Sequence, residues 1–175
     1  MRQPCDEMKN STKPARNGDE VIGRVKRSYP RLHRILVPLD FSGRSRQALK
    51  MAAPLAAKFG ARISLIHVMS GKGVTPEKGD VSLPGNSPRR TAAHKRLRET
   101  ALQFITEDQL DQTIVRAGNP ADEILATAHQ LHADLLAITT EGKDSFNRFF
   151  GGGTAAKVLR DAPCPVLAVR KTASG

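Results

Sequence analysis

The stretch Arg34–Val68, RILVPLDFSGRSRQALKMAAPLAAKFGARISLIHV, decides the fold class of this chain. It opens on a continuous apolar run, which is typical of a strand buried on both faces of a parallel sheet. A helical pattern of apolar residues follows over about Gly43–Phe59, where Ser42 can cap the start and Gly60 the end. A second strand is expected at Arg62–Val68. The stretch therefore predicts one β-α-β unit, whose crossover should be right-handed.

The same alternation continues to the end of the chain. A helix is expected over about Pro88–Glu107, with a buried stripe made of Leu97, Ala101, Leu102 and Ile105. Asn119 is a good N-cap for the next helix, because Pro120 suits its first position. Further strands are expected at Gln112–Gly118, Asp134–Thr139 and Pro165–Arg170, and a last helix at Thr154–Asp161. This order predicts an α/β fold, a three-layer α/β/α arrangement with a five-stranded, mostly parallel, Rossmann-like sheet.

The N-terminal segment differs in character from the rest. Residues 1–33 are polar, contain three prolines and lack sustained periodicity, which is typical of a flexible arm. The arm is also basic. We therefore predict an arm at residues 1–33, one domain at residues 34–171 and a short tail at residues 172–175.

The formal net charge of +11 is the extreme value of the composition. Such a charge attracts polyanions without sequence specificity. Aromatic residues make up only 4% of the chain and do not interleave with the basic ones as base-stacking platforms would, so we do not expect a nucleic-acid partner. No apolar run approaches the roughly 18 residues of a membrane span, and no secretory signal opens the chain. The expected location is cytoplasmic, without a membrane partner.

A glycine-rich stretch, TTEGKDSFNRFFGGGT at Thr139–Thr154, follows the fourth expected strand. Open parallel sheets bind ligands beyond the carboxyl ends of their strands, and here those ends are Pro38–Asp40, Val68 and the glycine stretch. Consecutive backbone amides ahead of a helix make a cradle for phosphate. A plain flexible loop explains the glycines equally well. The spacing matches neither a P-loop nor a Rossmann fingerprint.

Three blocks of this sequence resemble the universal stress protein family. They are the opening stretch above, GNPADEILATAHQLHADLLAITTEG in the middle, and GGTAAKVLRDAPCPVLAVRK at the end. The resemblance covers about residues 33–171. It implies a nucleotide-binding domain of the adenine nucleotide α-hydrolase-like type, commonly a homodimer joined through the last strand, here Pro165–Arg170.

The resemblance also implies which residues hold the nucleotide. ATP-binding members carry G-x-x-G, nine residues and then G-[ST], and these positions fall on Thr139, Gly142, Gly152 and Gly153. Two of the four match, because Thr139 adds a Cβ and Gly153 lacks a hydroxyl that Thr154 can replace from a shifted position. Losing a hydroxyl contact to a charged group weakens binding about tenfold or more.

The remaining implied site residues lie at the strand ends and in the glycine-rich loop. Asp40 would hold the adenosine end, or it is a turn residue ahead of the first helix. Pro38, Leu39 and Val68 would line an adenine slot, largely through backbone groups. Lys143 would neutralise phosphate charge, or it is a solvated loop cation.

The sequence contains no nucleophile with a base beside it, so we expect a regulatory binding module with weak ATPase activity at most. The expected ligand is ATP, AMP or another adenine nucleotide; whether Mg²⁺ accompanies it is left open. The leading hypothesis is a stress-response homodimer that acts on an unknown protein partner. The alternatives are a family member that acts as a protein-interaction scaffold without nucleotide, and a polyanion-associating protein that uses the basic arm.

Overall fold

The computed structural model describes residues 31–69, 88–140 and 153–170. Strands and helices alternate along these residues, as the apolar pattern predicts. The elements are β1 (Arg34–Pro38), α1 (Ser45–Phe59), β2 (Arg62–Met69), α2 (Pro88–Ala101), β3 (Leu110–Ala117), α3 (Pro120–Gln130), β4 (Leu135–Thr140), α5 (Thr154–Asp161) and β5 (Val166–Arg170).

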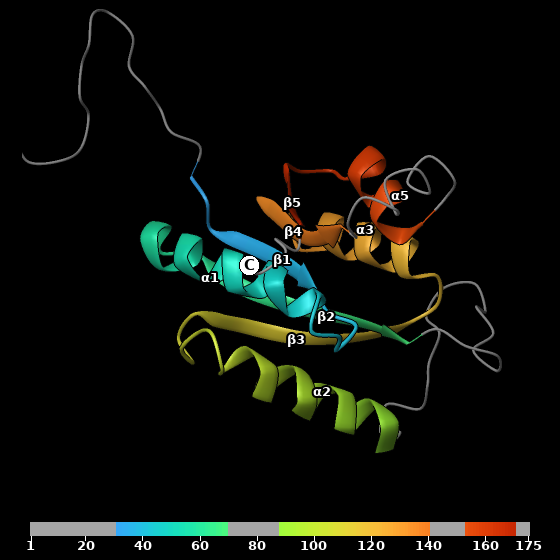
Figure 1. The fold of residues 1–175 in the computed structure, drawn as a ribbon, viewed down its shortest axis with the longest axis horizontal. Coiled ribbons are helices and arrows are strands. Elements are labelled where there is room, and N and C mark those ends of the chain that lie inside the picture. The colour runs from blue at the N-terminus through green and yellow to red at the C-terminus, as the bar shows by residue number, and fades with distance from the viewer. Residues whose placement is uncertain (1–30, 70–87, 141–152, 171–175) are drawn as a thin grey trace, which may run out of the picture. The chain divides into compact units, whose positions relative to one another are not determined.

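The five strands form one parallel sheet in the order β3-β2-β1-β4-β5. The first strand, β1, lies in the middle of the sheet, β2 and β3 follow on one side of it, and β4 and β5 lie on the other side (Figure 1). The strand order therefore reverses between β1 and β4. The carboxyl ends of these two strands flank the crevice in which sheets of this kind bind ligands.

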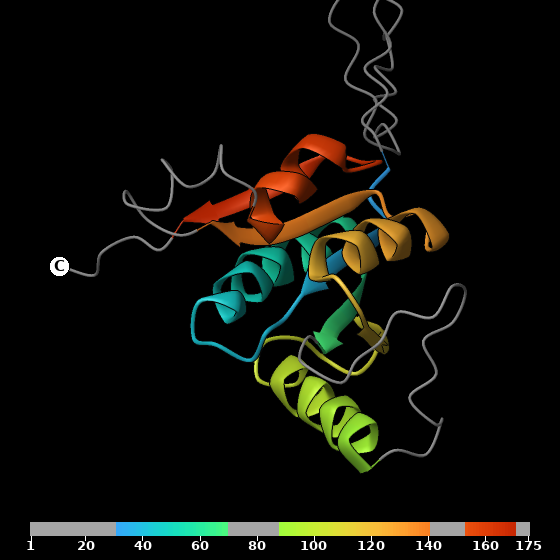
Figure 2. The same ribbon diagram turned by 90° about the vertical axis from the view of Figure 1, so that its right-hand side faces the viewer.

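Helices cover both faces of the sheet, which confirms the three-layer α/β/α prediction (Figures 1 and 2). One core cluster joins α1 and α2 to the sheet, and its fully buried members include Leu49, Leu65 and Leu97. A second cluster joins α3 and α5 to the opposite face around Leu36 and Val158. Within the described ranges, no helix combines the length and the apolar character that crossing a bilayer requires.

Local signals set most helix ends. The Asn119 side chain accepts hydrogen bonds from the amides of Ala121 and Asp122, at 3.0 and 3.3 Å, and so caps α3 as predicted. Gly60 ends α1 in the left-handed region at φ 65°. The helix α1 itself begins at Ser45, two residues later than predicted, because residues 43 and 44 form a turn. Ser42 still acts on this end of the helix, since its Oγ accepts the Ser45 amide at 3.1 Å.

The predicted length of α2 is wrong. The helix ends at Ala101 rather than near Glu107, and Leu102 is 41% exposed instead of belonging to the buried stripe. Ile105 is buried as predicted, but a turn places it there: its amide donates to the carbonyl of Ala101 at 3.0 Å. The apolar spacing continues past the helix end because a turn can also direct a side chain into the core.

Candidate functional site

The candidate site lies at the carboxyl edge of the sheet, where β1, β2 and β4 end. Asp40 is the second residue after β1, Val68 lies near the end of β2, and Thr139 lies near the end of β4. The reversal between β1 and β4 brings the first and last of these segments to adjacent strands although they are far apart in sequence. The strand ends that the sequence predicted to lie at the carboxyl edge of the sheet are therefore found together at that edge.

Asp40 organises the turn after β1. Its Oδ1 accepts the Ser42 amide at 2.9 Å, and its own amide donates to Ser45 Oγ at 3.3 Å. Partial burial raises the pKa of the carboxyl, but hydrogen bonds from Ser42 and Ser45 lower it by more, so the pKa of Asp40 lies below its ordinary value. The residue is exposed. Asp40 thus has the turn role that the sequence left open, and it also presents a negative charge to solvent at this edge.

Leu39 anchors the chain beside the site through its buried side chain and its backbone hydrogen bonds. Its side chain is buried, at 2% exposure, in the core cluster of α1 and α2. Its amide donates to the Ile66 carbonyl at 2.8 Å, and its carbonyl lies 2.7 Å from Nδ1 of His67. A carbonyl can only accept, so this His67 nitrogen carries a proton and donates.

The two faces of the sheet divide the predicted lining residues. Val68 packs on the cluster of α3 and α5, and Pro38 shares that face because strand residues alternate and Val37 belongs to the other cluster. Leu39 lies with α1 and α2, and Thr139 also faces that side, opposite to Ile138. The side chains of Pro38 and Val68 can therefore line one slot on the α3 and α5 face of the sheet. Leu39 and Thr139 lie on the opposite face, with α1 and α2.

Thr139 fits its position without strain. It is a regular residue of β4, half-buried, and its Cα pairs with that of Val169 on β5. Its φ angle is not among the positive ones of the described residues, which belong to Phe41, Gly60, Gly118 and His132. The backbone here does not require glycine, because a β conformation accommodates any Cβ.

The start of α5 has a glycine at its N-cap. Gly153 occupies this position with φ −71° and ψ 158°, and, having no side chain, it cannot cap the first amides of the helix as serine or asparagine would. A Cβ at Gly153 would meet nothing within 4 Å, so the position is open. Thr154, the first helical residue, is half-buried. An uncapped helix start leaves amides that suit an anion. Gly142, Lys143 and Gly152 lie outside the described residues.

Phe41 is a feature of this edge that the sequence did not single out. It has φ 63°, a left-handed conformation that costs a non-glycine residue about 1–2 kcal/mol. The His67 ring lies 4.3 Å from the Phe41 ring, centroid to centroid, and the Arg96 guanidinium carbon lies over the Phe41 ring, 4.3 Å from its centroid. These contacts from β2 and α2 hold the strained turn in place. In the sequence, the sign of this feature was a bulky residue directly after Asp40. The contact between Phe41 and Arg96 could not be predicted, because only the fold brings the two residues together.

Comparison with known proteins identifies the chain. A match to the Universal stress protein family extends over residues 31–170. The chain belongs to the universal stress protein family. A universal stress protein of Thermus aquaticus is 30% identical over 136 residues, covering 78% of this chain and 97% of the relative. The universal stress protein YxiE of Bacillus subtilis is 30% identical over 146 residues, covering 79% and 99%.

Solved structures agree with the fold. A universal stress protein crystallised in complex with cAMP superposes with a TM-score of 0.61 at 20% identity, covering 81% of this chain and 98% of that one. The universal stress protein of Archaeoglobus fulgidus in complex with dAMP gives a TM-score of 0.53 at 20% identity, covering 78% and 96%. At these identities the likeness establishes the fold of this universal stress protein.

Proposed function

We propose that this universal stress protein binds an adenine nucleotide, such as ATP or AMP, at the carboxyl edge of its sheet and uses it as a regulatory ligand. The observation that carries the proposal is the glycine N-cap of α5, which offers the first amides of the helix no side-chain acceptor of its own, in a fold whose strand order reverses between β1 and β4. Two structural neighbours are complexes with cAMP and dAMP.

The residues present fit such a ligand. The first amides of α5 and the Thr154 hydroxyl are donors that suit phosphate oxygens. The Asp40 carboxylate is an acceptor that suits ribose hydroxyls, and its lowered pKa keeps it ionised at neutral pH. Pro38 and Val68 share the face that would take the base. A bound nucleotide would bring negative charge to this edge of the sheet. The residues named here would hold the nucleotide in one orientation.

Calorimetry on the full chain with ATP, ADP, AMP and cyclic AMP tests the proposal. We expect at least one of these nucleotides to bind, and Asp40→Asn to weaken it about tenfold, because a neutral amide is a poorer acceptor for hydroxyls than a carboxylate. The matched control is Asp108→Asn, an exposed residue near the amino end of β3, which should leave binding unchanged. The proposal is wrong if none of the four nucleotides gives measurable heat or if both variants weaken binding equally.

One observation favours the alternative of a scaffold without nucleotide. The Leu39 amide already donates to Ile66, so it is not free for an adenine base, and the Leu39 carbonyl already has one partner in His67. If the chain is such a scaffold, the parent should not bind nucleotide, and the double variant Thr139→Gly with Gly153→Ser should gain binding. A parent that already binds excludes this alternative.

We also propose a homodimer through β5. This strand is the last in the sheet and pairs with β4 on one side, and its residues Ala168 and Arg170 are exposed. An apolar edge strand of this kind readily pairs with a second copy. Ala168→Lys should convert the dimer to a monomer in sedimentation velocity, whereas Ala126→Lys, an equally drastic change on the exposed face of α3, should not. A monomeric parent chain would contradict the proposal.

A further inference from the structure

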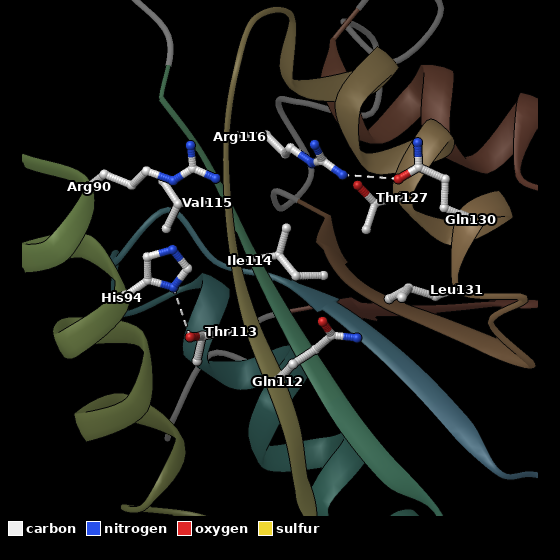
Figure 3. Close-up of a pocket in the computed structure, with 10 residues that line it drawn as sticks. All are labelled: Arg90, His94, Gln112, Thr113, Ile114, Val115, Arg116, Thr127, Gln130 and Leu131. Atoms are coloured by element: carbon white, nitrogen blue, oxygen red, sulfur yellow. Dashed lines mark hydrogen bonds between the residues drawn. The ribbon is translucent and has the colours of Figure 1, made fainter. Parts of the chain in front are cut away.

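A hollow of about 240 Å³ lies on the flank of β3, between α2 and α3 (Figure 3). Strand β3 is an edge of the sheet, at the opposite end from β5. The hollow runs along the middle of the strand, beside Gln112 to Arg116, rather than over the carboxyl edge that holds Asp40. It is therefore separate from the site proposed for the nucleotide.

The hollow is positively charged. Arg90 enters it from α2 and Arg116 from β3, and Figure 3 shows their guanidinium groups on either side of the strand. Among the residues that the structure describes, the lining contains no aspartate or glutamate. Arg116 donates through Nη2 to the Gln130 side chain at 3.0 Å, which orients one guanidinium without neutralising it. Two guanidinium groups without a lining carboxylate favour an anion.

His94 adds hydrogen-bonding capacity rather than charge. Its Nδ1 lies 2.9 Å from Thr113 Oγ1. Burial, followed by the positive charge of Arg90, lowers the pKa of the imidazole by more than its hydrogen bonding to Thr113 raises it. His94 is therefore mainly neutral near pH 7, and its ring offers polar contacts in the same hollow.

A buried hydroxyl in the hollow lacks a partner. Thr127 of α3 is only 2% exposed, and its Oγ1 has no hydrogen bond to any described residue. Figure 3 shows this hydroxyl turned toward the Arg116–Gln130 pair. An unpaired buried hydroxyl costs free energy in the free protein, because it has lost its hydrogen bonds to water without gaining others. A ligand oxygen beside Arg116 would give it a partner.

From these contacts we infer that the hollow is a second ligand site, which binds a small organic anion through a carboxylate or phosphate group. On the α3 side of β3, Arg116 provides the charge and Thr127 a neutral hydrogen bond, whereas Arg90 and His94 line the hollow from the α2 side of the strand. The volume corresponds to about eight water molecules, at about 30 Å³ each, and lies below the range of about 300–1,000 Å³ for drug-sized ligands. A small metabolite fits this space better than an extended peptide.

The test is a titration of the ¹⁵N-labelled full chain followed by NMR, with three probes. Succinate and inorganic phosphate distinguish a carboxylate ligand from a phosphate ligand, and succinamide has the shape of succinate without its charge. We expect succinate or phosphate to shift the amide signals of Thr113–Arg116 and Thr127 saturably, and succinamide to leave them unchanged. Equal shifts with succinamide, or no saturable shift with either anion, would overturn the inference.

Two variants separate a ligand site from a structural cluster. Arg116→Gln should weaken the anion about tenfold or more, whereas Arg89→Gln, the same charge change one residue outside the lining, should have less than a twofold effect. Thr127→Val should weaken the anion while raising the melting temperature of the free protein by about 2–4 °C, because the unpaired hydroxyl is removed. A Thr127→Val protein that is more stable but binds the anion equally well would mean that this threonine is only structural, and would overturn the inference.

A further binding experiment distinguishes this site from the nucleotide site. AMP binding should respond to Asp40→Asn and not to Arg116→Gln, and the small anion should show the reverse. AMP binding that is lost only in Arg116→Gln would contradict the proposed function and assign the nucleotide phosphate to this hollow. Binding of an acidic peptide to the flank of β3, in place of both small anions, would instead overturn the small-anion inference.

Discussion

Asp134 and Arg34 hold one another through two hydrogen bonds although 100 residues separate them in the chain. The Arg34 amide donates to Asp134 Oδ2 at 2.9 Å, and the Asp134 amide donates to the Arg34 carbonyl, also at 2.9 Å. The same carboxylate oxygen accepts the His33 amide at 2.9 Å. This clamp joins the first residue of β1 to the residue just before β4, at the amino edge of the sheet. It therefore fixes the strand pair at whose other end we propose the nucleotide site.

Asp134→Asn should lower the free energy of unfolding by about 1 kcal/mol at neutral pH. The amide side chain can still accept, but hydrogen bonds to a neutral oxygen are weaker than those to a carboxylate. Urea denaturation measures the loss. Glu99→Gln removes a charge from an exposed pair with Lys95, with an N–O distance of 3.9 Å, and should have almost no effect. Equal losses in both variants would show that the clamp is not specific.

The clamp should also make stability depend on pH. Desolvation raises the pKa of Asp134, but the His33 and Arg34 amides and positive charges lower it by more. The lowered pKa means that the stabilisation is complete above the unfolded-state value of about 3.9 and is lost as the pH falls through the folded-state value. The difference in stability between the parent and Asp134→Asn should therefore shrink below about pH 4. A difference that stays constant from neutral to acid pH contradicts this assignment.

Phe41 offers a comparison of packing with backbone strain. Phe41→Ala should destabilise the protein by about 1–2 kcal/mol, because a half-buried ring with contacts to His67 and Arg96 is lost while the left-handed backbone remains. Phe41→Gly should be less damaging than alanine by about 0.5–1 kcal/mol, since glycine adopts positive φ freely. Thermal or urea unfolding of both variants decides the order. An alanine variant as stable as the glycine variant would mean that the turn relaxes.

Gly153→Ser should stabilise α5. The position has N-cap dihedral angles, no side-chain cap and space for a Cβ, so a serine hydroxyl can accept a first-turn amide. We expect a gain of a few tenths of a kcal/mol over glycine, and about 1 kcal/mol over Gly153→Ala, which has no acceptor. Urea denaturation of the three proteins tests this ranking. If alanine equals serine, the side chain does not cap the helix.

Cys164 should react slowly with thiol reagents. Burial, followed by the charge of Asp134, raises the pKa of its thiol, and only the thiolate is the nucleophile. In a Cys5→Ser background, Asp134→Asn should speed its reaction with iodoacetamide near pH 8, because one source of the raised pKa is removed. Glu99→Gln serves again as the control. An unchanged rate in Asp134→Asn would show that the two groups are not electrostatically coupled.

The sequence by itself determined the fold class and much of the local structure. Continuous apolar runs alternate with amphipathic segments, and only a parallel sheet covered on both faces buries both patterns. Asn119 and Gly60 set helix ends through contacts within a few residues, so local sequence was sufficient for them. The carboxyl-edge location of Asp40 and Val68 also followed from the element order.

Only the tertiary structure decided which distant residues meet. The order of the strands placed Arg34 beside Asp134, and the packing of α2 placed Arg96 on Phe41. It also assigned Pro38 and Val68 to one face and Leu39 to the other, and it gathered Arg90, Arg116 and Thr127 around one hollow. Local preferences act over a few residues along the chain. Contacts between remote segments depend on how all the layers pack at once, which no single stretch of sequence contains.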